Sequence, residues 1–302
     1  MRRIVWVMAA LACCLAAGAA YASAPDCPNG GTVHFGVVPG EDTAQLLPIY
    51  GRIGKLIAAR LGCAIVTQTG TSYTAVIEAM RAHRVEMANF GAFSYVLAHA
   101  VAGAEAVATF AAADGTPGTY FATITTWPGS GITTLQQVRG KAFAFSDPAS
   151  TSGNLYPRVG LLNAGINPEK DFKKVLFSGT HPATVLTVAA GKVDAGGFSA
   201  SAETRLIALH RMAPDDLRIL WTSELIPNGP TTVRKGLPEQ LKKDIQAAFL
   251  AIPTKDPELW SNIVNTYRTN TSGMSYVSVN DGTYDGLRSY TSKVKDFNFV
   301  DK

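Results

Sequence analysis

Apolar and polar residues in the first third of the chain are arranged so that short extended runs alternate with helical ones. A β-rich run at 33–38 ends at Pro39-Gly40, and apolar residues then recur at helical spacing over 44–61. Thr71-Ser72 can cap a further helix. Strands and helices are predicted in turn at 33–38, 44–61, 63–66, 73–80, 85–90 and 93–100. This order is typical of a mostly parallel sheet with helices on its faces.

The alternation restarts after a segment of turn-forming residues at 114–118, and a second break follows at 227–230. The later strands are expected at 120–126, 141–146, 175–177, 193–198 and 218–221, and the later helices at 135–138, 150–164, 182–190, 202–209, 238–251, 256–267 and 284–294. Two α/β units joined at two breaks would enclose a cleft, where small ligands bind. We expect one lobe from 25–118 with 226–302, and a second from 119–225.

Residues 1–24 have the pattern of a cleaved secretory signal peptide. Two arginines form a positive start, residues 4–20 carry no charge, and small residues that fit a cleavage site follow. A retained membrane anchor is the alternative, although the uncharged run is barely long enough to span a bilayer. A lipoprotein would need a lipobox before Cys13 or Cys14, and the preceding residues match one poorly.

Composition and charge exclude two classes of protein. The 302 residues are 47% hydrophobic and 17% charged, which excludes an intrinsically disordered chain. The formal net charge is only +4, and it falls to +2 when the signal peptide takes its two arginines away. So low a charge excludes a strongly basic nucleic-acid binder, and it means that local groups would have to attract an anion.

Removal of the signal peptide leaves two cysteines, Cys27 and Cys63. An even pair in an exported protein is expected to form a disulfide. Two free thiols or a soft-metal site are the alternatives, and the metal site is poorly supported because no CxxC or histidine cluster accompanies the pair.

Ser150-Thr151-Ser152-Gly153 is the run of residues that carries chemistry, between a predicted strand end and a predicted helix start. A helix N-terminus presents N–H groups and a partial positive charge, and the three hydroxyls add further donors. The glycine lets the backbone come close to a ligand. Together these groups would form a neutral site for a tetrahedral oxyanion. An ordinary helix N-cap is the alternative.

The run belongs to a wider pattern, whose specific part is Asp147–Gly153 with Ser178–His181 downstream. Further matches in order and spacing occur at 73–80, 85–91, 114–118 and 226–230. With these residues the chain resembles, over 33–251, the periplasmic phosphonate- and phosphite-binding proteins of ABC importers. The resemblance implies an α/β protein with a type II periplasmic-binding fold, in which two lobes with mostly parallel sheets surround a ligand cleft.

The resemblance also implies roles for single residues. The hydroxyls of the 150–152 run would hold the oxyanion, His181 would donate a further hydrogen bond, and Tyr73 would reach across from the other lobe. Taken alone, His181 could be a loop histidine and Tyr73 a core aromatic residue. The expected ligand-binding residues are Ser150, Thr151, Ser152, Gly153, His181, Tyr73, Phe90, Thr119, Tyr120 and Ser201.

Departures from the family pattern bear on the ligand. Members that bind an aminoalkylphosphonate hold its ammonium group with two carboxylates, and the matching positions here are Ser201 and Gly229. Thr119 stands at the position of a second aromatic contact, with Tyr120 beside it, and Phe90 replaces a Trp or Tyr. Phosphite, a simple alkylphosphonate or a ligand outside the family's usual chemistry is therefore expected. The acids Glu41, Asp42 and Asp194 are expected to be solvated or structural.

We expect a periplasmic solute-binding protein that delivers a small oxyanion to the membrane permease of an ABC importer. A monomer is expected, with no cofactor, no metal and no nucleic-acid partner. No enzyme is expected, because the G-x-S-x-G pattern fails at Ser201 and the five histidines lack metal-ligand spacing. A sensor subunit for a membrane kinase, or a binding protein for a non-phosphonate ligand, is the alternative. We expect a hinge at Thr116–Thr119 and Glu224–Gly229.

Overall fold

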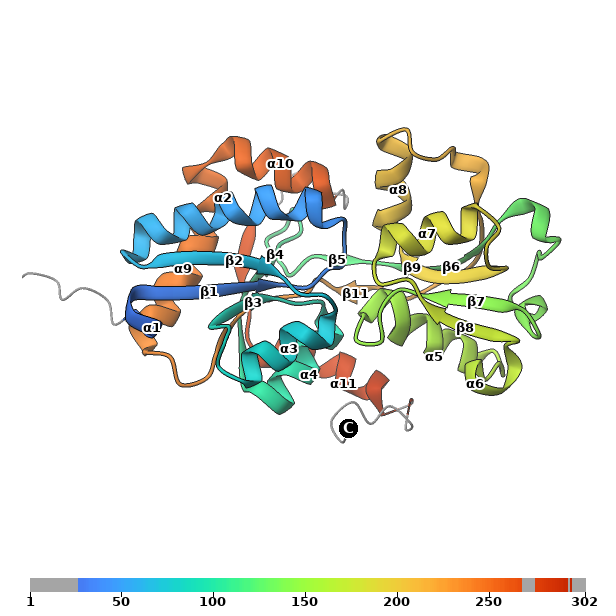
Figure 1. The fold of residues 1–302 in the computed structure, drawn as a ribbon, viewed down its shortest axis with the longest axis horizontal. Coiled ribbons are helices and arrows are strands. Elements are labelled where there is room, and N and C mark those ends of the chain that lie inside the picture. The colour runs from blue at the N-terminus through green and yellow to red at the C-terminus, as the bar shows by residue number, and fades with distance from the viewer. Residues whose placement is uncertain (1–26, 268–274, 293, 295–302) are drawn as a thin grey trace, which may run out of the picture.

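The computed structural model describes residues 27–267, 275–292 and 294, and it shows two α/β lobes side by side (Figure 1). The predicted signal peptide, 1–24, lies outside the described residues. Within the described ranges, no helix has the length and apolar character needed to cross a bilayer. The two lobes match the fold expected from the sequence.

The first lobe is built on a six-stranded sheet with the order β13-β4-β12-β3-β1-β2. Its strands are β1 (Thr32–Val37), β2 (Ala64–Thr69), β3 (Met87–Asn89), β4 (Ala104–Phe110), β12 (Thr231–Arg234) and β13 (Tyr276–Ser278). Its helices are α1 (Pro28–Gly31), α2 (Thr43–Leu61), α3 (Tyr73–Arg81), α4 (Ala92–Ala102), α9 (Glu239–Lys255), α10 (Pro257–Tyr267) and α11 (Asp285–Thr291), with the short 3-10 turn η5 (Asp281–Tyr284).

The second lobe is built on a five-stranded sheet with the order β10-β6-β9-β7-β8. Its strands are β6 (Ala122–Thr126), β7 (Ala142–Phe145), β8 (Lys174–Phe177), β9 (Ala195–Ser199) and β10 (Arg218–Thr222). Its helices are α5 (Tyr156–Asn163), α6 (Pro168–Asp171), α7 (His181–Ala189) and α8 (Ala200–Ala208). The shorter turns are η1 (Pro128–Ser130), η2 (Leu135–Val138), the π-helical turn η3 (Thr151–Leu155) and η4 (Pro214–Asp216).

Both sheets are mixed, whereas the sequence predicts mostly parallel sheets. Parallel pairs join β1 to β2 and β3, and β7 to β8 and β9. However, β12 enters antiparallel between β3 and β4, β13 pairs antiparallel with β4, and β6 lies antiparallel between β9 and β10. β6 and β12 each follow a crossing of the chain between the lobes and run against their neighbours, and β13, which follows α10, runs against β4 at the edge of the first sheet.

Two short strands connect the lobes. β5 (Thr119–Tyr120) and β11 (Ile226–Pro227) pair antiparallel and lie between the two sheets (Figure 1). The single strand expected at 120–126 is thus divided at Phe121, with β5 in the connection and β6 in the second lobe. The two connecting segments meet in one small ribbon.

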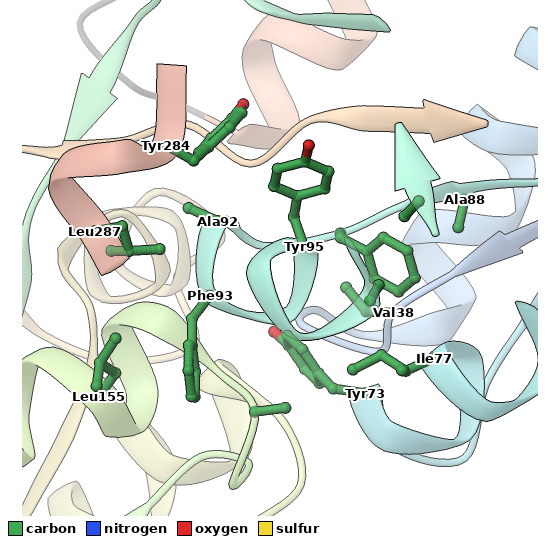
Figure 2. Close-up of a cluster of buried hydrophobic side chains, with 14 of the residues drawn as sticks. Val38, Tyr73, Ile77, Ala88, Ala92, Phe93, Tyr95, Leu155, Tyr284 and Leu287 are labelled. Atoms are coloured by element: carbon green, nitrogen blue, oxygen red, sulfur yellow. The ribbon is translucent and has the colours of Figure 1, made fainter. Parts of the chain in front are cut away.

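A disulfide and a shared apolar cluster hold these elements together. Cys27 and Cys63 are bonded, with Cα atoms 5.8 Å apart, which confirms the expected pairing. Figure 2 shows Tyr73 of α3, Phe93 of α4 and Leu287 of α11 in one buried cluster with Leu155 of η3. Since Leu155 belongs to the second lobe and the other three residues to the first, this apolar core is continuous across the boundary.

Candidate functional site

A cavity of about 130 Å³ lies between the lobes. It is smaller than the roughly 300–1,000 Å³ typical of pockets for drug-sized ligands, so it suits a small ion. Six of the ten residues expected to bind a ligand line it, namely Tyr73, Phe90, Tyr120, Ser152, His181 and Ser201. The other four, Ser150, Thr151, Gly153 and Thr119, lie outside the described lining.

The three hydroxyl residues before α5 have three different positions. Ser152 lines the cavity. Ser150 is the N-cap of η3, and its Oγ accepts a hydrogen bond from the N–H of Gly153 at 3.0 Å. Thr151 faces the other lobe, where its Oγ1 accepts from the N–H of Phe93 at 2.9 Å. The expected N-cap and the expected ligand contact therefore fall on different residues of the same run.

Gly153 and Thr119 do not line the cavity and instead have roles in the local structure. A Cβ on Gly153 would lie 2.4 Å from Cβ of Ser146 and 2.9 Å from Oγ of Ser150, so no side chain fits there. Thr119 is exposed in β5, where it pairs with Pro227 of β11. Its neighbour Tyr120 lines the cavity and hydrogen-bonds to Ser152.

His181 is held as a hydrogen-bond donor by its surroundings. The N–H of Ser199 donates to Nδ1 of His181 at 3.2 Å, so Nδ1 carries no proton. Burial lowers the pKa of His181 to about 4, so the ring is neutral near pH 7. A neutral ring with a bare Nδ1 has its proton on Nε2. Since His181 lines the cavity, the ring offers a neutral N–H donor that can bind an anion.

Tyr73 is placed at the cavity by its position at the start of α3. Its N–H donates to Oδ2 of Asp147 in the second lobe at 3.2 Å, and its hydroxyl hydrogen-bonds to Ser150. Burial raises the pKa of Tyr73, and the nearby Asp147 raises it further, so the hydroxyl stays protonated. Tyr73 thus provides a neutral hydroxyl between the two lobes.

Three hydrogen bonds, each donated by a main-chain N–H group, join the lobes around the cavity. Two of them are the bonds of Phe93 N–H to Thr151 and of Tyr73 N–H to Asp147. In the third, the N–H of His181 donates to the carbonyl oxygen of Gly40 at 3.0 Å. These three bonds are called the inter-lobe bonds below.

An ion pair in the cavity wall was not foreseen from the sequence. Glu41 lines the cavity and is 7% exposed, and its carboxylate pairs with the guanidinium of Arg205 on α8. Arg205 also donates from Nη1 to the carbonyl oxygen of Thr266 at 2.6 Å. No local pattern could reveal this pair, because its members lie in different lobes.

The other two acids considered from the sequence are structural, as expected. Asp42 caps α2, where its Oδ1 accepts from the N–H of Ala44 at 3.0 Å. Asp194 accepts from the N–H of Ala142 at 2.8 Å. Neither is among the residues described as lining the cavity, so Glu41 differs from both.

Ser201 and Gly229, which stand where aminoalkylphosphonate-binding members are expected to have carboxylates, both lie in the cavity wall. Ser201 hydrogen-bonds to Ser199 at 2.7 Å between their Oγ atoms. A Cβ on Gly229 would lie 2.0 Å from the carbonyl oxygen of Phe90, so a carboxylate side chain has no room there. Among the described lining residues, only Glu41 carries a carboxylate and none is Lys or Arg. No group of three or more His, Cys, Asp or Glu in the described part of the chain could hold a metal.

Comparison with known proteins agrees with the resemblance seen in the sequence. The phosphate-import protein PhnD of Mycolicibacterium smegmatis is 27% identical over 93% of this chain and 94% of its own. The phosphonates-binding periplasmic protein of Escherichia coli is 29% identical over 72% of this chain and 65% of its own.

Solved structures show the same fold. A binding protein component of an ABC phosphonate transporter from Pseudomonas aeruginosa superposes with a TM-score of 0.78 at 23% identity, covering 87% of this chain and 86% of that one. PhnD1 from Prochlorococcus marinus, in complex with methylphosphonate, also has a TM-score of 0.78, at 19% identity and covering 88% of this chain and 99% of that one. Residues 35–270 match the family described as "ABC transporter, phosphonate, periplasmic substrate-binding protein". The chain therefore belongs to the periplasmic substrate-binding proteins of phosphonate ABC transporters.

Proposed function

We propose that this protein captures phosphite or a small alkylphosphonate in the cavity between its lobes and delivers it to the permease of an ABC importer. The observation that carries the proposal is the neutral set of donors in a small cavity, with the Nε2–H of His181 and the hydroxyls of Ser152 and Tyr73. Hydrogen bonds from neutral donors to a charged group contribute about 1.5–3 kcal/mol each. Such donors can therefore bind an oxyanion without a cationic side chain.

The cavity wall favours a ligand without an ammonium group. The relatives' names refer to phosphate, phosphonates and phosphite, so family membership leaves several oxyanions open. In this chain Ser201 and Gly229 offer no carboxylate, and the carboxylate of Glu41 is already paired with Arg205. An ammonium group in the cavity would lose its hydration without gaining an unpaired anion.

Closure around the ligand is proposed to use the two connecting segments as a hinge. The hinge residues are Thr116–Thr119 and Glu224–Gly229, and the lobes they separate are 25–118 with 226–302, and 119–225. The pairing of β5 with β11 supports this proposal, because it brings both segments into one short ribbon between the sheets. A ligand that contacts both lobes would shift the population toward the closed form.

The expected partners are the oxyanion and the permease, in the periplasm after removal of the signal peptide. The protein is proposed to act as a monomer, without catalysis and without nucleic acid. Names of relatives as periplasmic binding and import proteins support this role.

Isothermal titration calorimetry on the chain without residues 1–24 tests the ligand. The panel is phosphite, methylphosphonate, 2-aminoethylphosphonate, phosphate and sulfate. Phosphite or methylphosphonate is expected to bind more tightly than 2-aminoethylphosphonate, and sulfate serves as the control for non-specific anion binding. Tight binding of 2-aminoethylphosphonate would refute the assignment, and absence of binding by any phosphorus oxyanion would refute the proposed function.

A further inference from the structure

The carboxylate of Glu41 stands in the wall of a cavity that is otherwise suited to an anion. It follows β1 in the first lobe, it is 7% exposed, and it is the acidic side chain among the described lining residues. A negative charge at that place would repel a bound oxyanion, and burial away from water strengthens the repulsion. Something must therefore balance this charge in the binding form.

Arg205 supplies the balancing charge from the other lobe. Its side chain is 5% exposed and pairs with Glu41, while Nη1 donates to the carbonyl oxygen of Thr266 at 2.6 Å. Thr266 lies on α10, so this bond gives the guanidinium a second contact with the first lobe, in addition to Glu41. Arg205 is not among the described residues that line the cavity, so its charge acts at a distance, as the counterion of Glu41.

We propose that Arg205 is a positioning residue that sets the charge specificity of the site. By neutralising Glu41 it allows the cavity to hold an anion that has no cationic tail. Without Arg205, the free carboxylate of Glu41 would repel such an anion and would favour a zwitterion whose ammonium group can pair with it. This inference rests on the proposed function, since it concerns the selectivity of that same oxyanion site.

A pair of ligands of equal shape measures this selectivity. Ethylphosphonate and aminomethylphosphonate differ by a methyl in place of an ammonium group, so the ratio of their dissociation constants reports the electrostatics of the cavity. Methylphosphonate, which is smaller than both, serves as a reference that should follow ethylphosphonate in every variant. The titrations use the chain without residues 1–24.

Three variants separate charge from structure, namely R205Q, E41Q and the double variant E41Q/R205Q. R205Q is expected to shift the ratio at least tenfold toward aminomethylphosphonate, chiefly by weakening the alkylphosphonates. E41Q leaves the cation of Arg205 beside the cavity and should shift the ratio in the opposite direction. The double variant removes both charges and should return the ratio to within about threefold of the wild-type value.

The outcomes that overturn the inference are distinct from failure of the proposed function. If R205Q and E41Q weaken all ligands equally, the pair joins the lobes without setting specificity. If the double variant stays as selective as R205Q, Arg205 acts on the ligand directly. Should R205Q fail to fold, the opposite shift in E41Q and the recovery in the double variant decide the question. If the wild-type protein binds none of these phosphonates, nor phosphite or phosphate, both the proposed function and this inference are overturned.

Discussion

Replacement of His181 by Asn should change how the stability of the protein depends on pH. The amide oxygen of Asn can replace Nδ1 as acceptor for the N–H of Ser199, but it does not titrate. In the folded protein the pKa of His181 is lowered to about 4 by burial, from 6.5 in an unfolded chain. Between these pH values the unfolded state binds a proton that the folded state does not, so stability falls as the pH falls.

The magnitude follows from the size of that difference. A lowering from 6.5 to about 4 corresponds to about 3 kcal/mol, at about 1.4 kcal/mol for each pKa unit. The wild-type protein should therefore lose about 3 kcal/mol more unfolding free energy than H181N between pH 7 and pH 4. Almost none of the difference should arise above pH 7, where both states are neutral.

Urea unfolding of both proteins at half-unit steps from pH 4 to pH 7.5 measures this difference. All other titrating groups are shared, so their contributions cancel in the comparison. Nitrogen chemical shifts of the imidazole provide a second readout, with the proton expected on Nε2. A difference in unfolding free energy that stays constant with pH, or a proton found on Nδ1, would refute the reasoning.

Three further predictions concern other parts of the structure. Thr151→Ala removes the acceptor of the Phe93 N–H and should weaken ligand binding by about 1–3 kcal/mol in calorimetry. Thr151→Ser keeps that acceptor and should preserve the affinity. Unchanged affinity in the alanine variant would contradict the role assigned to Thr151. Gly229→Ala should lower the unfolding free energy measured in urea by about 1–3 kcal/mol, because the new Cβ would lie 2.0 Å from the carbonyl oxygen of Phe90. An unfolding free energy equal to that of the wild type would refute this prediction. C27S/C63S should lose about 3–4 kcal/mol of unfolding free energy, with ligand affinity retained as the control.

The long periodic elements of this fold could be predicted from the sequence. α2 has a regular apolar face, an Asp42 cap and a Gly62 stop, and it was expected to within a residue. β4, β12 and β13 were missed. β4 is rich in alanine, a residue with little β-propensity, and β12 and β13 are only four and three residues long. Pairing with distant strands stabilises them, and no local pattern reports such pairing.

In the site, residues within a short sequence pattern could be predicted, whereas positions that depend on contacts between the lobes could not. Ser152 and His181 were expected at the ligand from a short pattern of residues, and both line the cavity. The pattern did not separate Ser152 from Thr151, whose hydroxyl turns toward Phe93 instead. Glu41 was expected to be solvated or structural, and no local pattern indicated its pairing with Arg205, which lies far along the chain. The positions of Thr151 and Glu41 both depend on contacts between the lobes.

The inter-lobe bonds have a consequence for the strength of binding. Each is made between protein groups in or next to the cavity wall, so part of the free energy of closure comes from the chain itself. The apparent dissociation constant of any ligand is its intrinsic value divided by the fraction of molecules already closed. Loosening these bonds would therefore raise the apparent constants of all ligands by one common factor, so affinity and selectivity can be tuned separately in this protein.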